Sequence, residues 1–183
     1  MKIGIPREVK ILEGRVALIP DATGHLVGQG HTVYIEHDAG RLSGYSDEDY
    51  REVGVEILPD AASLYQAAEM IVKVKEPQPE ELGLLREDHL LFSYLHLAAE
   101  PELTEALLKI GLTAVGFETV QVGRQLPLLA PMSDIAGRIA AQIGAQLLYQ
   151  PQGGRGVLLG GLPAAERGNV VILGAGTAGG NAA

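Results

Sequence analysis

The sequence predicts an α/β protein built on a mainly parallel sheet. Short apolar runs alternate along its 183 residues with polar-capped segments of helical character, the pattern of βαβ units. Hydrophobic residues make up 46% and charged residues 20% of the chain, a balance typical of a globular protein with a sizeable core. We therefore expect a flavodoxin-like parallel sheet flanked by helices, followed by a connecting helix and the start of a Rossmann domain.

The predicted strands and helices follow from apolar periodicity and capping residues. The strands are expected at residues 2–5, 32–36, 55–58, 70–75, 89–95 and 113–117, and the helices at 21–29, 46–53, 60–68 and 101–110. Asp21, Ser46 and Asp60 stand where helix N-caps are wanted, and Gly111 follows the last helix as a C-terminal stop. The charged stretch 79–88 is interpreted as a solvated face.

A change of pattern near residue 130 predicts two parts. Ile135, Ile139, Ile143 and Leu147 recur every four residues, which indicates one long helix from Ser133 to about residue 149. A Gly- and Pro-rich loop over 151–168 and an apolar run at 170–173 follow. We expect one domain over residues 1–130, and over 131–183 a connecting helix with the first strand and glycine turn of an incomplete nucleotide-binding domain.

Charge and composition exclude several classes of function. The chain has 14 Lys and Arg against 23 Asp and Glu, a formal charge of -9, which argues against nucleic acid or an anionic membrane as the main partner. It has no cysteine, so disulfides and thiol chemistry are excluded. Neither a targeting segment nor a long apolar run is recognisable, which makes the cytoplasm the expected location.

The strongest local motif is glycine-rich. After the apolar run 170–173, Gly174, Gly176 and Gly179 have the spacing G-x-G-x-x-G. In dinucleotide-binding proteins these glycines permit a tight turn, close approach of the backbone to a pyrophosphate, and close packing of helix on strand. A glycine-rich tail is the alternative, although the preceding apolar run favours dinucleotide binding. The acidic residue that separates NAD from NADP would lie beyond residue 183, so the choice stays open.

Three basic groups stand at predicted carboxyl ends of strands, where ligands of parallel sheets bind. Arg15 follows the first strand, Lys75 ends the fourth, and His96 follows the fifth. A guanidinium grips a carboxylate, an ammonium polarises a carbonyl, and an imidazole moves a proton near neutral pH. Together they suit a small 2-oxo acid, and we expect their terminal atoms within about 10 Å of one another. The alternatives are surface charges and a structural histidine. Lys73, two residues before Lys75 on the same strand face, competes for its role.

The other histidines show no spacing that would pair them as metal ligands. They are His25, His31, His37 and His89, and all four are interpreted as surface or turn residues. No metal site is predicted.

Five segments together resemble the alanine dehydrogenase/transhydrogenase N-terminal family, and bacterial alanine dehydrogenases in particular. They are MKIGIPREVKILEGRVALIP, MIVKVKEPQPEE, LLFSYLHLAAEPELTEALL, PMSDIAGRIAAQIGAQ and GGRGVLLGG, in the family's order. The chain departs from the family at Asp134, where Glu is expected, and in a shortened segment at 120–131.

The resemblance implies a function and the residues that perform it. The intact enzyme would interconvert L-alanine with pyruvate and ammonia using NAD, as a homo-oligomer, hexameric by resemblance. In the substrate domain, Arg15 and Lys75 would bind substrate, and His96 would be the catalytic acid/base. The residues that would contact NAD are Ser133, Gly174, Gly176, Thr177, Ala178 and Gly179. The alternatives are a non-catalytic module that binds small carboxylates or serves assembly, and a transhydrogenase-like nucleotide-binding subunit. The isolated fragment is expected to be inactive.

Overall fold

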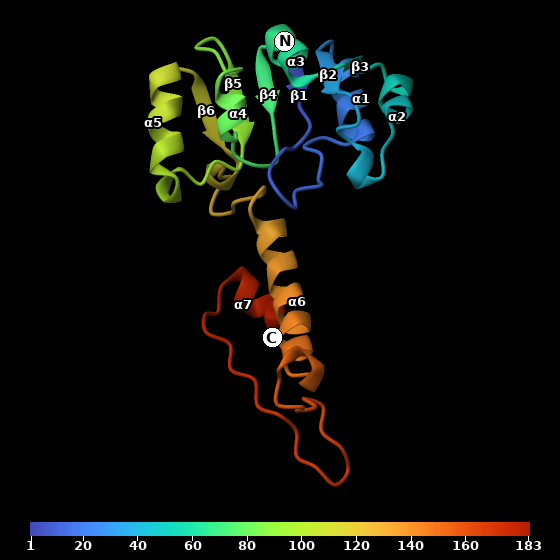
Figure 1. The fold of residues 1–183 in the computed structure, drawn as a ribbon, viewed down its shortest axis with the longest axis vertical. Coiled ribbons are helices and arrows are strands. Elements are labelled where there is room, and N and C mark those ends of the chain that lie inside the picture. Colours follow the sequence, from blue (N-terminus) through green and yellow to red (C-terminus); the bar gives the residue numbers. More distant parts are fainter. The chain divides into compact units, whose positions relative to one another are not determined.

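A computed structural model describes all residues 1–183, which divide into two compact units, Met1–Val120 and Gln121–Ala183. Unit 1 contains a six-stranded sheet in which every pairing is parallel (Figure 1). Its strands are β1 (Lys2–Ile5), β2 (Thr32–Glu36), β3 (Glu56–Leu58), β4 (Met70–Val72), β5 (Leu90–Ser93) and β6 (Thr113–Gly116). The predicted parallel α/β class is confirmed.

The strand order gives the sheet a point where its winding reverses. The order is β3-β2-β1-β4-β5-β6, because the chain leaves the edge strand β3, passes β1 and starts β4 on the other side. A flavodoxin sheet has the order 2-1-3-4-5, whereas this order is that of dinucleotide-binding sheets. Apolar periodicity does not specify which side of β1 the fourth strand joins. The reversal point lies between the carboxyl ends of β1 and β4.

Four of the five α-helices of unit 1 begin and end close to the predicted positions. They are α1 (Pro20–Gly28), α2 (Asp47–Glu52), α3 (Ala61–Ala67) and α5 (Pro101–Ile110), whereas the short helix α4 (Pro79–Leu82) was not predicted and lies in the stretch interpreted as a solvated face. Ser46 and Asp60 are confirmed as N-caps that accept backbone N–H groups, and Gly111 ends α5 in the left-handed conformation. The prediction for Asp21 is wrong. Helix α1 begins one residue earlier at Pro20, whose fixed φ suits a first helical turn, and Asp21 lies within that turn.

The core of unit 1 forms two clusters on opposite faces of the sheet. Alternate side chains of β2 point to opposite faces, because Val33 and Ile35 belong to one cluster while Tyr34 packs against the other. The first cluster contains Leu64, Tyr65, Ala68, Ile71, Leu85, Leu91, Leu95, Leu103 and Leu107, and the second contains Ile5, Val33, Ile35, Ala39, Tyr50 and Val55. Unit 1 therefore has a complete apolar interior.

Two polar residues expected at the surface are buried. Glu81, within the stretch predicted as a solvated face, is 3% exposed and accepts a hydrogen bond from the Tyr65 hydroxyl. His89 is 1% exposed, and its ring bonds the Tyr65 carbonyl oxygen and the Arg86 backbone N–H. Burial lowers the pKa of His89, in keeping with a neutral ring that donates on one side and accepts on the other. Both predictions failed because hydrogen bonds offset the cost of burial.

Unit 2 is built on α6 (Ala130–Leu147), against which α7 (Thr177–Ala182) packs. The contact is close at Gly137, where an added Cβ would lie 2.2 Å from the Ala178 carbonyl oxygen. The apolar positions of α6 spaced by four residues are 45% to 60% exposed. The predicted strand at 170–173 is not formed. These residues pair with no other strand and are 38% to 94% exposed, because an isolated strand has no neighbour to bond.

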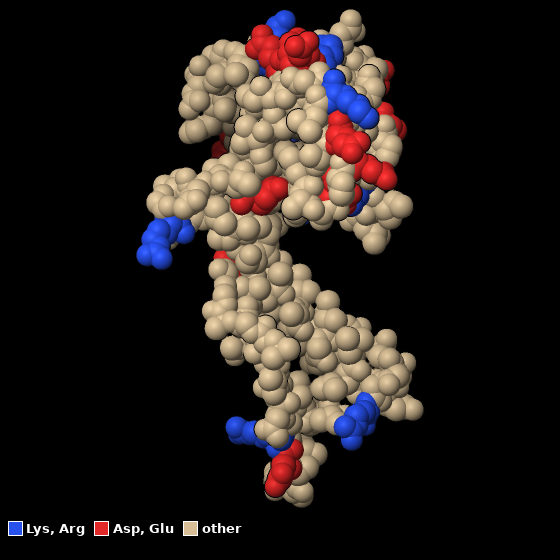
Figure 2. All heavy atoms as spheres, turned by 90° about the vertical axis from the view of Figure 1, so that its left-hand side faces the viewer, with Lys and Arg blue, Asp and Glu red and all other residues tan.

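The surface of the two units differs in charge. On the face shown in Figure 2, acidic and basic side chains crowd unit 1, whereas unit 2 carries only a few. No helix is both long and apolar enough to cross a membrane.

Candidate active site at the carboxyl edge of the sheet

The topology places the three basic groups on neighbouring chain segments at one edge of the sheet. Arg15 lies in the segment after β1, Lys75 three residues after the end of β4, and His96 three residues after the end of β5. Strands β1 and β4 flank the reversal point, and β5 is the next strand. Ligands of doubly wound sheets bind outside the carboxyl ends of the strands at such a point.

Arg15 is exposed, and its guanidinium contacts the carboxylate of Glu13. Nε lies 2.9 Å from Glu13 Oε1 and one Nη lies 2.7 Å from Oε2, two parallel hydrogen bonds of the kind that a bound acid would make. These bonds raise the pKa of Arg15 and lower that of Glu13. The pair lines a cavity of about 160 Å³ that also includes Arg7 and Arg41. Any carboxylate from solution that approached Arg15 would therefore compete with Glu13.

Lys73 and Lys75 have different environments. Lys73 is completely buried, and its Nζ lies 2.7 Å from Glu81 Oε1 and 3.4 Å from Glu8 Oε2, ion-pair contacts without hydrogen-bond alignment. Lys75 is partly exposed, and its positive charge contributes to lowering the pKa of Glu13. Lys73 is thus occupied by two acidic partners inside the protein, whereas Lys75 shares the electrostatic environment of Arg15.

His96 is exposed and has a left-handed backbone, with φ 50° and ψ 32°. This conformation costs a residue with a Cβ about 1–2 kcal/mol. Its backbone N–H donates to Glu118 Oε1 at 2.8 Å. Its ring stacks on Tyr94, with centroids 6.3 Å apart and planes at 15°. His96 and Glu118 both line a cavity of about 470 Å³.

Tyr94 stacks on His96 and lies within the electrostatic reach of Arg15, and it was not among the residues predicted from the sequence. Its ring stacks on His96 and meets Phe117 edge-on, with centroids 5.1 Å apart. Burial raises the pKa of the Tyr94 hydroxyl, and the positive charge of Arg15 opposes that rise. Its place two residues before His96 was the available indication, because alternate residues at a strand end point to the same side.

Unit 2 brings together two residues expected to contact the cofactor. Ser133 on α6 and Thr177 at the start of α7 line one cavity of about 450 Å³, together with Arg124. Gly174 has φ +105°, which favours glycine, and an added Cβ on Gly179 would lie 1.9 Å from the Gly174 carbonyl oxygen. Around Gly176 the space is open. These glycines fit the tight turn, the close packing and the exposed backbone that a pyrophosphate requires. Ala178 follows Thr177 on α7 and is exposed.

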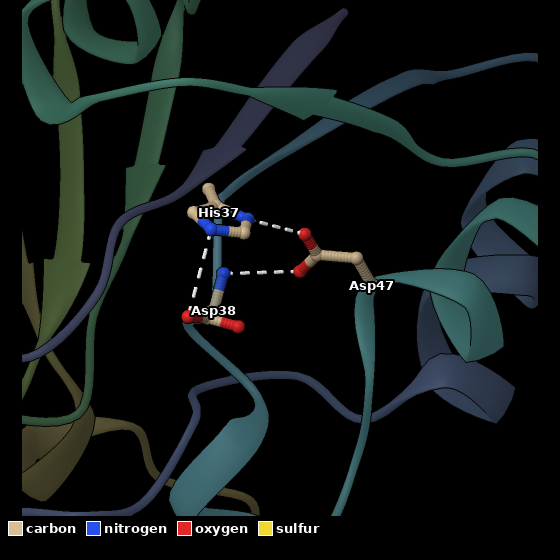
Figure 3. Close-up of side chains that lie close together, drawn as sticks. All are labelled: His37, Asp38 and Asp47. Atoms are coloured by element: carbon tan, nitrogen blue, oxygen red, sulfur yellow. Dashed lines mark hydrogen bonds and ion pairs between the residues drawn. The ribbon is translucent and has the colours of Figure 1, made fainter.

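A histidine and two aspartates cluster elsewhere on unit 1 (Figure 3). His37 Nδ1 lies 2.6 Å from Asp47 Oδ2 and Nε2 lies 3.5 Å from Asp38 Oδ2, while the Asp38 backbone N–H donates to Asp47 Oδ1. The hydrogen bond to Asp47 raises the pKa of His37. Three donor atoms within 4.8 Å could hold a metal ion, but each already has a protein partner. The cluster connects the end of β2 to the start of α2.

The fold and the position of these basic groups define a class of protein: a doubly wound α/β protein with three basic side chains after the carboxyl ends of β1, β4 and β5. The N-terminal domain of the alanine dehydrogenase/PNT family matches residues 4–136, and its C-terminal domain matches residues 140–183. The chain belongs to this family, as the sequence motifs predicted.

Individual relatives agree with the family. The chain is 53% identical to an alanine dehydrogenase of Bacillus subtilis and 52% identical to one of Methanococcus maripaludis, and the alignments cover 100% of this chain and 48% and 49% of those proteins. It therefore spans about half the length of the curated relatives it matches. A solved L-alanine dehydrogenase matches all of this chain and 50% of its own, with 53% identity and a TM-score of 0.91. The transhydrogenase from Sinorhizobium meliloti matches 79% of this chain and 44% of its own, with 26% identity and a TM-score of 0.70.

Proposed function

We propose that this chain supplies the substrate domain and the first cofactor contacts of an NAD-dependent alanine dehydrogenase, which interconverts L-alanine with pyruvate and ammonia. The observation that carries the proposal is the position of Arg15, Lys75 and His96 after β1, β4 and β5 around the reversal point. The relatives named alanine dehydrogenase support the choice of substrate. A cytoplasmic, hexameric enzyme is part of the proposal.

Each basic group has a separate task. Arg15 would exchange Glu13 for the substrate carboxylate, using the same two-bond geometry. Lys75 would polarise the carbonyl oxygen of pyruvate and stabilise negative charge that develops there. His96 would remove or return the proton on the oxygen of the carbinolamine, with its ring plane set by Tyr94.

The cofactor would be held by unit 2. The turn with Gly174, Gly176 and Gly179 suits a pyrophosphate, with Thr177 and Ala178 beside it and Ser133 near the nicotinamide. The nicotinamide ring supplies the acceptor for the hydride that leaves the substrate Cα.

A transhydrogenase-like nucleotide-binding subunit is the second candidate, favoured by the likeness to the Sinorhizobium meliloti structure. A subunit of that kind would bind the dinucleotide without oxidising alanine. The two candidates are separated by an assay of NADH production in the complete polypeptide, meaning this chain extended to the length of its alanine dehydrogenase relatives. NADH production that does not depend on alanine, or the absence of any NADH production, would remove the proposed function.

Removal of the proposed proton carrier is expected to have the largest kinetic effect. In the complete polypeptide, His96→Ala should lower the rate of alanine oxidation by about 10²-fold or more, the usual scale for a positioned acid/base. Arg15→Ala should raise KM for alanine and pyruvate more than it lowers kcat. His25→Ala, an exposed histidine on α1, is the control and should keep the normal rate. Normal turnover in His96→Ala would reassign the proton to another group, with Lys75 first.

The 183-residue polypeptide by itself should lack alanine dehydrogenase activity and bind NAD⁺ poorly. A dinucleotide site uses two βαβαβ halves and an acidic residue after the second strand, and residues 121–183 contain one glycine turn without a sheet. The measurements are calorimetric titration with NAD⁺ and an NADH assay with excess alanine. Micromolar binding or turnover would contradict this expectation.

A further inference from the structure

The β4–β5 ladder ends just before the residues proposed to do the chemistry. Its last bonds run from the Lys73 N–H to the Phe92 carbonyl oxygen at 3.1 Å and from the Tyr94 N–H to the Val74 carbonyl oxygen at 3.2 Å. Beyond them, backbone N–H groups in a buried position need another acceptor. Two glutamates from elsewhere in the sequence provide it.

Glu8 accepts hydrogen bonds from the backbone just after β4. Its Oε1 accepts the Val74 N–H at 2.6 Å and its Oε2 accepts the Lys75 N–H at 3.3 Å. The Glu8 side chain is only 3% exposed, and the ammonium of Lys73 lies 3.4 Å from Oε2. Lys73 therefore offsets the charge of a carboxylate whose two oxygens bind two consecutive backbone N–H groups.

Glu118 makes the equivalent contact at the end of β5. Its Oε1 accepts the His96 N–H at 2.8 Å and the Leu95 N–H at 3.2 Å, and Oε2 lies 3.3 Å from the same Leu95 nitrogen. Glu118 belongs to the short helical turn Phe117–Thr119, directly after β6. The bond to His96 is made to a residue in the left-handed conformation, which persists only where its surroundings hold it.

We propose that Glu8 and Glu118 are positioning residues, which fix the backbones of Lys75 and His96 so that the two side chains meet the substrate in a set geometry. The catalytic meaning of this inference rests on the proposed function, whereas the backbone contacts do not. A carboxylate suits the task because it only accepts, has two oxygens, and makes stronger bonds to N–H groups than a neutral oxygen does. Holding the backbone leaves each side chain free to bind and to exchange protons.

Amide hydrogen exchange of the 183-residue chain, followed by NMR, tests the contacts with each glutamate as the control for the other. Glu118→Ala should speed exchange at Leu95 and His96 by about 10-fold or more and leave Val74 and Lys75 unchanged, and Glu8→Ala should do the reverse. The amides of Tyr34 and Ile35 in β2 report global stability and should not change. Faster exchange throughout the sheet, or no local change, would overturn the proposal.

The Gln variants keep the test informative if an alanine variant fails to fold. Glu8→Gln retains one acceptor oxygen and places an NH₂ group against the second backbone N–H, so only one amide of the pair should exchange faster. In Glu118→Gln the acceptor facing His96 can be kept, and Leu95 should change more than His96. Equal exchange rates in wild type and both Gln variants would count against the contacts.

Kinetics of the complete polypeptide test the positioning role. Glu118→Gln and Glu118→Ala should lower kcat for alanine oxidation by about 10-fold to 100-fold, because a small displacement of a reacting group has effects on this scale, while KM for NAD⁺ stays unchanged. A normal kcat in a variant whose Leu95 and His96 amides exchange faster would overturn the positioning role. Absence of alanine oxidation in the wild type would instead end the proposed function, and the exchange data would still decide whether the contacts exist.

Discussion

The two units of this chain differ in how far their apolar residues are buried. In unit 1 each strand has a parallel neighbour, and residues such as Leu64 and Ile71 are completely buried. In unit 2 the apolar positions of α6 and the run 170–173 are largely exposed, and Gly137 is the only buried residue. The residues proposed to bind substrate therefore stand on a self-sufficient scaffold, whereas the glycine turn proposed for the cofactor has no sheet beneath it.

This difference should be largest in amide hydrogen exchange. Strand amides of β1, β2 and β5 should be protected at least about 10³-fold more than amides of 170–173, because opening the sheet requires much of the global unfolding free energy while the exposed run requires almost none. Mass spectrometry of exchanged peptides would measure it. Equal protection of 170–173 and β1 would contradict the comparison, because residues 170–173 would then be hydrogen-bonded to a segment with which the structure does not pair them.

Truncating one apolar side chain in each unit should give the next largest effect. Leu64→Ala in the core of unit 1 should lower the free energy of unfolding by about 2–5 kcal/mol, through lost burial and a residual cavity. Ile139→Ala on α6, where the side chain is 45% exposed, should change it by about 0.5 kcal/mol or less. Urea denaturation monitors both variants. A comparable loss in Ile139→Ala would show that α6 is packed as tightly as the core.

The smallest effect should come from the surface of unit 1, at His37. The pKa of His37 is raised above its ordinary 6.5, so the stability from its contacts is fully present below pH 6.5 and is lost as pH rises through the folded-state pKa. Asp47→Asn should move this pKa back toward 6.5, part of the way, because Asp38 stays 3.5 Å from Nε2. NMR titration of the His37 ring measures the shift. An unchanged pKa would mean that the contact with Asp47 is absent in solution.

Much of unit 1 could be predicted because its elements carry local patterns. Apolar alternation located all six strands to within a few residues, and Ser46, Asp60 and Gly111 marked helix ends through capping chemistry. The same pattern placed Arg15 and His96 after strands. It placed Lys75 at the end of the fourth strand, whereas β4 ends three residues earlier at Val72. That these strands flank one reversal point depends on the side of β1 that β4 joins, which is a long-range choice.

The environment of each charged group could not be predicted, because it depends on residues distant in sequence. A period of two places Lys73 and Lys75 on one strand face, yet Lys73 is buried and forms ion pairs with Glu8 and Glu81. Glu81 and His89 have ordinary surface-residue types and are buried because Tyr65 supplies hydrogen bonds to both. Glu118 lies far along the chain from His96, and no motif connects them.

If Arg15 binds the substrate carboxylate as proposed, its ion pair with Glu13 is an internal competitor for that carboxylate. Glu13 is tethered two residues from Arg15, so it presents a carboxylate at a high effective concentration and never diffuses away. Its lowered pKa keeps it ionised throughout the neutral range. On that proposal, the apparent affinity of Arg15 for an acid from solution depends on how well this acid competes with Glu13. Removal of the Glu13 carboxylate would then tighten the binding of substrate and of product alike.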